Sequence, residues 1–256
     1  MLLVIATVFI AAAGYVINDY FDTAIDAINK PGKNITGTLL SRKTILNLYL
    51  ALNVAALIII WYFGHLQGIN YPVLVFFLSA GLLYFYSASY KKMLLIGNLV
   101  ISFLSAITIS LSILFDQNAF VSEPVKTLVI AYTLFAFLMT FVREIIKDCE
   151  DAAGDSVFGA NTFPLVAGKN AAHVSAAMLG AIILGTVVYI QVGQMQWQNK
   201  ISFFYTIAFI EVPLIWLIIG NILAKTKVHD KRNSAIAKFI MVTGLFSMLI
   251  FQLTSN

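Results

Sequence analysis

Charge, cysteine and histidine are all scarce in this chain. Only 11% of its 256 residues are charged, whereas a soluble domain carries about a quarter. The single cysteine, Cys149, excludes an internal disulfide, and three histidines without a CxxC pair give no zinc pattern. Cys149 stands between Asp148 and Glu150, whose negative charges disfavour a reactive thiolate. A soluble fold, a disulfide scaffold and a zinc site are therefore not expected.

Apolar residues dominate instead, at 60% of the chain with a mean hydropathy of +0.89. Runs long enough to cross the hydrocarbon of a bilayer predict an all-α integral membrane protein, because open strand edges are not stable in lipid. We predict a bundle of about eight transmembrane helices in a single membrane domain covering residues 1–256. The predicted spans are 2–17, 45–63, 72–89, 94–114, 126–142, 171–191, 203–223 and 235–252.

Basic residues test this topology, because they concentrate in cytoplasmic loops. Fourteen basic residues lie on the side of the membrane that the loops after spans one, three, five and seven reach. The other side has only Lys126 and Lys200. The fourteen are Lys30, Lys33, Arg42, Lys43, Lys91, Lys92, Arg143, Lys147, Lys169, Lys225, Lys227, Lys231, Arg232 and Lys238. We expect a multi-pass protein of the cell (inner) membrane. The net positive charge is explained by the membrane topology, so no nucleic acid partner is expected. No obligate protein partner is evident.

An acidic motif follows the first span, at residues 18–33. Its Asp19, Asp22 and Asp26 fall within about 60° of one another on a helix, and Asn18 widens the arc to about 100°. Such a face requires a counter-charge near a bilayer. Oxygen ligands of this kind suit Mg²⁺, which protein carboxylates hold against substrate phosphates. The alternative is a solvated acidic face without a ligand.

A second acidic motif repeats this spacing. Asp148, Asp151 and Asp155 each lie 129 positions after their counterparts, from 19 to 148, 22 to 151 and 26 to 155. The repetition predicts a duplication with two halves, about 1–125 and 126–256, and one site shared by both motifs on the cytoplasmic side. A proline and then a glycine follow each copy and are expected to end helical structure: Pro31 with Gly37, and Pro164 with Gly168.

Cations lie near both motifs. The aromatic segment 84–92 ends in Lys91 and Lys92, which we expect to face phosphate oxygens, although an interfacial belt with topogenic lysines is an equal interpretation. Arg143 and Lys147 are about one turn apart on a predicted helix that continues into the second motif. They suit phosphate binding, or they pair with Glu144 or Asp151 at helical spacing.

Two other segments remain. Glu211, two residues before Pro213, is the only acid deep in a predicted span, and it either orients an acceptor or packs as a neutral residue. The basic segment 225–233 is expected to be topogenic and to face the lipid headgroups.

These motifs resemble those of the UbiA superfamily of intramembrane prenyltransferases. The N-D-x-x-D-x-x-x-D pattern matches at Asn18, Asp19, Asp22 and Asp26, with N-x-P at Asn29 and Pro31. The D-x-x-x-D pattern matches at Asp151 and Asp155, preceded by Asp148, and T-x-P and glycine match at Thr162, Pro164 and Gly168. Lys33 stands where many members have arginine.

The resemblance implies a helical bundle, usually of nine spans, around a central cavity. The bundle would hold Mg²⁺ against the diphosphate of a polyprenyl donor. Eight spans here would then reflect loss of the family's first helix. The predicted metal ligands are Asn18, Asp19, Asp22, Asp26, Asp148, Asp151 and Asp155, with Asp22, Asp26, Asp151 and Asp155 taken as catalytic. The predicted substrate-binding residues are Lys33, Tyr86, Tyr90, Lys91, Arg143, Lys147 and Glu211.

Within the superfamily the motifs are most similar to the geranylgeranylglycerol-phosphate geranylgeranyltransferase group. The expected reaction is prenyl transfer from a diphosphate donor to a lipid or aromatic acceptor, best to geranylgeranylglyceryl phosphate, in contact with membrane lipid. Prenylation of 4-hydroxybenzoate, dihydroxynaphthoate or haem is the alternative. From other classes, a cation or metabolite transporter would explain a duplication, but not the prolines after both motifs or the many carboxylates at one depth. A phosphoalcohol transferase would have its acidic residues in a single cluster, whereas the two motifs here are 129 residues apart.

Overall fold

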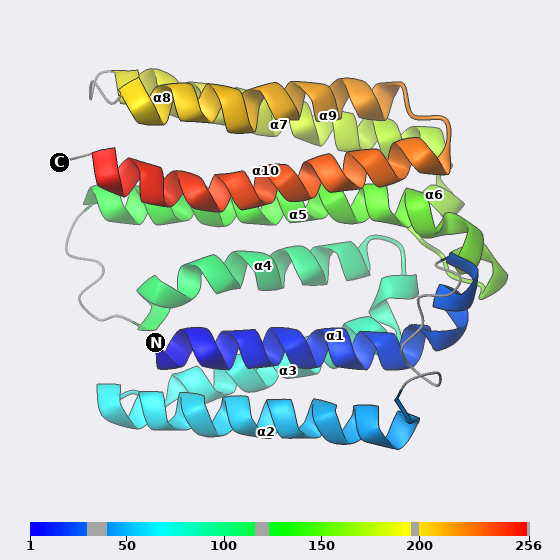
Figure 1. The fold of residues 1–256 in the computed structure, drawn as a ribbon, viewed down its shortest axis with the longest axis vertical. Coiled ribbons are helices and arrows are strands. Elements are labelled where there is room, and N and C mark those ends of the chain that lie inside the picture. The colour runs from blue at the N-terminus through cyan, green and yellow to red at the C-terminus, as the bar shows by residue number, and fades with distance from the viewer. Residues whose placement is uncertain (30–39, 116–122, 196–199, 255–256) are drawn as a thin grey trace. The chain divides into compact units, whose positions relative to one another are not determined.

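A computed structural model describes residues 1–29, 40–115, 123–195 and 200–254, and over these ranges the chain is helical without a strand (Figure 1). The elements are α1 (Leu2–Asn29), α2 (Arg42–Gln67), α3 (Tyr71–Ala88), the 3₁₀ turn η1 (Tyr90–Lys92), α4 (Ile96–Phe115), α5 (Glu123–Val157), α6 (Phe163–Val166), α7 (Lys169–Met195), α8 (Lys200–Thr206), the π-helical segment η2 (Ile207–Glu211), α9 (Val212–Ile222) and α10 (Lys227–Thr254).

The predicted all-α membrane fold is confirmed. In the described ranges, seven helices are long and apolar enough to cross a membrane, with α8, η2 and α9 forming one of them. The predicted span 94–114 corresponds to α4, whose apolar portion Ile96–Leu111 is shorter than the other seven. Two helices extend well beyond their predicted spans, since α1 continues to Asn29 and α5 to Val157.

The chain folds as two compact units. The first comprises Met1–Lys126 with Ala153–Thr162, and the second comprises Thr127–Ala152 with Phe163–Asn256. The helix α5 therefore contributes to both, passing from the second unit to the first between Ala152 and Ala153. The last turn of the second acidic motif, with Asp155, belongs to the first unit.

In the first unit, α1 packs against α2 and α3 (Figure 1). Its core is an apolar cluster that includes Ile10, Ile60, Phe76 and Phe115. A Cβ on Gly14 would lie 3.0 Å from Leu83, so the absence of a side chain at this position lets α1 and α3 pack closely.

In the second unit, α9 packs against α7 and α10, and α5 runs along α10 (Figure 1). The contact between α5 and α10 is close, because a Cβ on Gly244 would lie 2.5 Å from Phe135. Tyr132 and Ser247 share a hydrogen bond of 2.7 Å across the same pair of helices. Helices that approach through small residues and polar contacts are typical of bundles in lipid.

The expected effect of proline and glycine after the second motif is wrong in part. The helix α5 ends at Val157, and Gly159 follows with a left-handed φ of 66°. Pro164 begins no loop but lies within α6, where a proline near the first turn costs no helical hydrogen bond. Gly168, with a φ of 88°, then separates α6 from α7, as expected of a helix-ending glycine. Pro31 and Gly37 lie outside the described residues.

Candidate functional site

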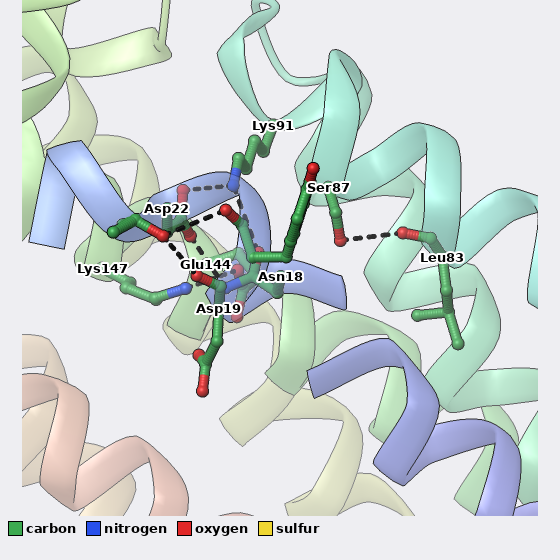
Figure 2. Close-up of polar contacts among 10 residues, drawn as sticks. Asn18, Asp19, Asp22, Leu83, Ser87, Lys91, Glu144 and Lys147 are labelled. Carbon is green, nitrogen blue, oxygen red and sulfur yellow. Dashed lines mark hydrogen bonds and ion pairs between the residues drawn. The ribbon is translucent and has the colours of Figure 1, made fainter. Parts of the chain in front are cut away.

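The first acidic motif lies on the last three turns of α1, beyond its apolar part. Because α1 is unbroken, Asn18 and Asp22 are one turn apart on one face, and the Asn18 amide donates to Asp22 Oδ2 at 2.8 Å (Figure 2). Asp26 lies a further turn along and is half-buried, whereas Asp19 is exposed. The structure therefore brings Asn18 and Asp22 together as the helical spacing predicts.

A cation from another element meets this face. Figure 2 shows the Lys91 ammonium of η1 pointing toward Asp22, with which it forms an ion pair. The same ammonium donates to Asn18 Oδ1 at 3.3 Å. The side chains of Lys91 and Asp22 are only 13% and 15% exposed, so this pairing is shielded from the solvent that weakens surface ion pairs. Lys91 is thus a counter-charge for the first motif.

The backbone around η1 is held tightly. A Cβ on Gly97, in the first turn of α4, would lie 2.7 Å from the Lys91 Cα and 2.9 Å from the Tyr90 carbonyl oxygen, so only glycine allows this approach. Leu95 joins η1 to α4 with a φ of 58°, a left-handed conformation that costs a residue with a Cβ about 1–2 kcal/mol. The position of Lys91 is therefore fixed by the chain on its C-terminal side.

The end of the second motif is joined to the same turn. Asp155 lies in the final turn of α5, and its carbonyl accepts from Ala160 N–H at 3.0 Å. The next residue, Asn161, donates its N–H to the Lys92 carbonyl at 2.8 Å. Within the first unit, η1 thus contacts the first motif through the Lys91 side chain and the segment after Asp155 through the Lys92 backbone.

Aromatic rings surround η1 and the end of α1. Phe21 meets Tyr84 edge to face at 5.7 Å between ring centroids, and Tyr90 stacks on Phe85 at 6.0 Å. Tyr86, which sequence analysis assigned to substrate binding, is half-buried. These rings provide an electron-rich, partly apolar wall beside the acidic face.

In the second unit the cations of α5 pair with a buried acid. Glu144 is 4% exposed and forms an ion pair with Arg143, and the Lys147 ammonium lies 3.9 Å from its other carboxylate oxygen. Pairing with Glu144, one of the two interpretations of these cations, is therefore confirmed. Asp148 and Asp151 are half-buried on the following turn. Glu144 was not among the predicted site residues, although its spacing from Lys147 is that of an ion pair on one helix face.

A polar cluster at the start of α7 and α10 was not predicted from the sequence. Its His173 and Asp230 are buried, whereas the Lys169 side chain is 46% exposed. The segment 225–233 was expected to face lipid headgroups, which is wrong for part of it. Asp230 and Asn233 are 1% and 0% exposed, because the first turn of α10 packs inside the second unit. Lys169 and His173 are four residues apart, the only local sign that they share a helix face.

Glu211 lies in the π-helical segment of the seventh predicted span. Pro213 has no N–H to donate to the Phe209 carbonyl, which accepts instead from the Thr243 hydroxyl of α10 at 2.8 Å. Among the described residues, Glu211 Oε1 is buried with no hydrogen-bond partner. π-Helical turns of this kind are frequent at functional sites. Lys33, the remaining predicted substrate-binding residue, lies outside the described residues.

The oxygen ligands at the first motif fit a hard cation. Asn18 Oδ1 and Asp22 Oδ1 already converge on one positive charge, the Lys91 ammonium. In the part of the chain that the structure describes, no three His, Cys, Asp or Glu side chains are grouped so as to hold a metal ion alone. Mg²⁺ typically uses one or two carboxylates and completes its shell with water and substrate phosphate. The residues present therefore fit a magnesium ion that is shared with a phosphorylated substrate.

Comparisons with known proteins find a family model and relatives that agree with one another. A family model described as the UbiA prenyltransferase family matches residues 1–249. The digeranylgeranylglyceryl phosphate synthase of Methanothermobacter thermautotrophicus is 38% identical over 193 residues, which cover 74% of this chain and 64% of the relative. The enzyme of the same name from Saccharolobus solfataricus is 32% identical over 244 residues, covering 95% of this chain and 81% of the relative.

A solved structure shares the fold. It is described as "Structural and mechanistic insights into the biosynthesis of Digeranylgeranylglyceryl phosphate synthase in membranes", and it is similar with a TM-score of 0.67 at 24% identity. The similarity covers 99% of this chain and 84% of that chain. It supports the helical membrane architecture described above.

Proposed function

Because this chain belongs to the UbiA prenyltransferase family and is thus an enzyme, we propose that it transfers a polyprenyl group from a prenyl diphosphate to a lipid acceptor. The best acceptor is geranylgeranylglyceryl phosphate and the best donor carries a geranylgeranyl group, since several relatives have the name digeranylgeranylglyceryl phosphate synthase. The observation that carries the proposal is the cluster of Asn18, Asp22 and Lys91, in which oxygen ligands and a cation converge near the end of α1. Family membership favours this enzyme over the transporter.

We propose that the acidic residues of both motifs hold magnesium against the donor's diphosphate. When bound, Mg²⁺ neutralises the negative charge that grows on the diphosphate as its bond to the prenyl carbon breaks. In the first unit, Asn18, Asp22 and Asp155 would supply oxygen ligands, and Lys91 would donate hydrogen bonds to phosphate oxygens. In the second unit, Asp148 and Asp151 are the proposed oxygen ligands, with Arg143 and Lys147 as proposed phosphate donors. The Lys91 ammonium would then leave Asp22 and bind a phosphate oxygen, which requires only a short movement of its flexible side chain.

The prenyl carbon that loses diphosphate becomes electron-poor before the acceptor oxygen attacks it. The rings of Phe21, Tyr84 and Tyr90 stand beside the acidic face and stabilise positive charge while they exclude water. The proton of the acceptor hydroxyl leaves to a motif carboxylate or to the diphosphate. By the positive-inside rule this chemistry takes place at the cytoplasmic surface of the cell membrane.

An acceptor screen tests this function. Membranes containing the chain are incubated with Mg²⁺ and donors of several lengths, together with geranylgeranylglyceryl phosphate, dihydroxynaphthoate or 4-hydroxybenzoate. We expect product mass to show one added geranylgeranyl group on geranylgeranylglyceryl phosphate. Product formed only on an aromatic acceptor would replace the lipid assignment, and no product with any acceptor would contradict prenyl transfer.

Lys91→Ala is expected to raise the KM for the donor about tenfold, because a charge-assisted hydrogen bond contributes about 1.5–3 kcal/mol. The variant loses the ammonium that meets Asp22 and would reach phosphate. The measurement is initial rate against donor concentration, with Lys43→Ala as the control because Lys43 is an exposed lysine of the same unit. An unchanged donor KM would return Lys91 to a topogenic role.

Glu211→Gln is expected to change the KM for the acceptor about fivefold, because one hydrogen bond contributes about 1 kcal/mol. The KM for the donor should stay within about twofold of the unmodified value. The reason is that Glu211 lies deep in its span with Oε1 unpartnered among the described residues. Both constants are measured on the same preparation, so the donor KM is the internal control. Equal changes in the two would indicate a packing role for Glu211.

A further inference from the structure

The cluster of Lys169, His173 and Asp230 joins three helices of the second unit at one point. Lys169 is the first residue of α7, and His173 is one turn further along the same face. Asp230 lies in the first turn of α10 and accepts from His173 Nε2 at 2.8 Å. The Lys169 ammonium lies 3.7 Å from Asp230 Oδ2 and donates to the Cys149 carbonyl of α5 at 2.7 Å.

Burial makes this cluster energetically demanding. Asp230 is 1% exposed and His173 is 4% exposed. A buried carboxylate is stable only where hydrogen bonds and an opposite charge replace its water, so Asp230 requires both of its partners. With His173 and Lys169 in place, Asp230 fixes where the Lys169 ammonium lies.

The position of Lys169 is not explained by its own helix. A positive charge at the first residue of a helix opposes the helix dipole, so Lys169 is unfavourable for α7 taken alone. Its two contacts outside α7, to Asp230 and to the Cys149 carbonyl, provide the compensation. The Lys169 side chain is 46% exposed, so it bridges from the buried pair to the edge of α5.

The carbonyl that Lys169 holds belongs to the second acidic motif. Cys149 follows Asp148 and precedes Asp151 by two residues, and its own side chain is buried. At about 100° per residue, Asp151 lies on nearly the opposite side of α5 from the buried Cys149, and Asp148 lies about a quarter of a turn round the helix from it. A contact on the backbone at Cys149 therefore sets the position along the helix axis, and the rotation about it, of the turn that carries both carboxylates.

From these contacts we propose that Lys169, anchored by Asp230 and His173, is a positioning residue for the second acidic motif. It sets the geometry in which Asp148 and Asp151 bind magnesium without touching metal or substrate. The inference rests on the proposed metal-dependent function. Partners that orient metal ligands typically change metal affinity by about 10–100-fold when removed, which gives the size of effect expected here.

The test measures Mn²⁺ binding to the full chain in detergent, in the presence of inorganic diphosphate. Electron paramagnetic resonance reports this binding as a loss of the free Mn²⁺ signal. Lys169→Met is expected to weaken Mn²⁺ binding about tenfold. Lys169→Arg retains a donor cation and is expected to keep most of the affinity. Lys231→Met is the matched control, because Lys231 is an exposed lysine in the same turn as Asp230 and is expected to bind as the unmodified chain does.

Thermal unfolding of each variant separates positioning from stability. A Lys169→Met variant with lower thermal stability but unchanged Mn²⁺ affinity overturns the positioning role, as does one with neither property changed. Asp230→Asn keeps the size and one acceptor oxygen, and it must weaken Mn²⁺ binding in the same direction even if Lys169→Met does not fold. Failure of the unmodified chain to bind Mn²⁺ would contradict the metal-dependent function itself, whereas intact binding by the folded variants contradicts only this inference.

Discussion

Asp22→Asn is expected to lower the rate of prenyl transfer by about a hundredfold or more, the usual scale for loss of one charged group at a reacting centre. Asp22 is the point at which the first motif meets its cation, since it accepts from Asn18 and pairs with Lys91. Asparagine has the same size and still accepts from Asn18, but it cannot balance a magnesium ion or the Lys91 ammonium. The loss should therefore be electrostatic, with the helix α1 retained.

Initial rates at saturating donor, acceptor and Mg²⁺ measure this effect, and thermal unfolding shows that the fold persists. The control is Asp116→Asn, an equal loss of charge in the segment between the predicted spans 94–114 and 126–142. We expect the control to keep at least half of the activity. Near-normal transfer by Asp22→Asn would remove this residue from the metal site and leave the Lys91 pairing as a structural contact.

Asp155→Asn is expected to have an effect of similar size, about a hundredfold or more. The carboxylate of Asp155 is a predicted magnesium ligand, while its backbone carbonyl caps the turn that leads to Asn161. The substitution changes only the side chain, so the hydrogen bonds from Ala160 to Asp155 and from Asn161 to Lys92 should remain. Activity is then lost without release of the segment from η1.

The informative measurement for Asp155→Asn is the rate as a function of Mg²⁺ concentration. A lost ligand should shift half-maximal activation to higher Mg²⁺, if any activity remains, as well as lower the maximal rate. Glu150→Gln is the matched control, because it removes the same charge from α5 without being a predicted ligand. An Asp155→Asn variant that needs no more Mg²⁺ than the control would restrict the second motif to Asp148 and Asp151.

Several contacts of the candidate site follow from the sequence because they are local. Asn18 and Asp22 are one turn apart, and so are Glu144 and Lys147, so helical geometry alone brings each pair together. The same holds for the membrane spans, since each is set by a run of apolar residues whose length matches the bilayer. The helical placement of both acidic motifs also follows from their spacing, and α1 and α5 continue through them beyond the apolar runs.

Other contacts depend on helices that are distant along the chain. Lys91 meets Asp22 across 69 residues, and His173 meets Asp230 across 57. The burial of Asp230 and Asn233 contradicts the expectation for part of the basic segment 225–233, since its local composition is typical of a loop at the lipid headgroups. Composition cannot show which face of α10 turns inward.

The sequence by itself determined that this is a helical membrane protein with two matched acidic motifs and a resemblance to prenyltransferases. These properties depend on hydropathy and on helical periodicity, which act over a few turns. Only the tertiary structure decided that Lys91 neutralises Asp22, that η1 also holds the segment after Asp155, and that Lys169 contacts the backbone of the second motif. The physical reason is that each of these contacts depends on how whole helices pack, and packing in lipid is set by small residues and buried polar pairs from distant parts of the chain.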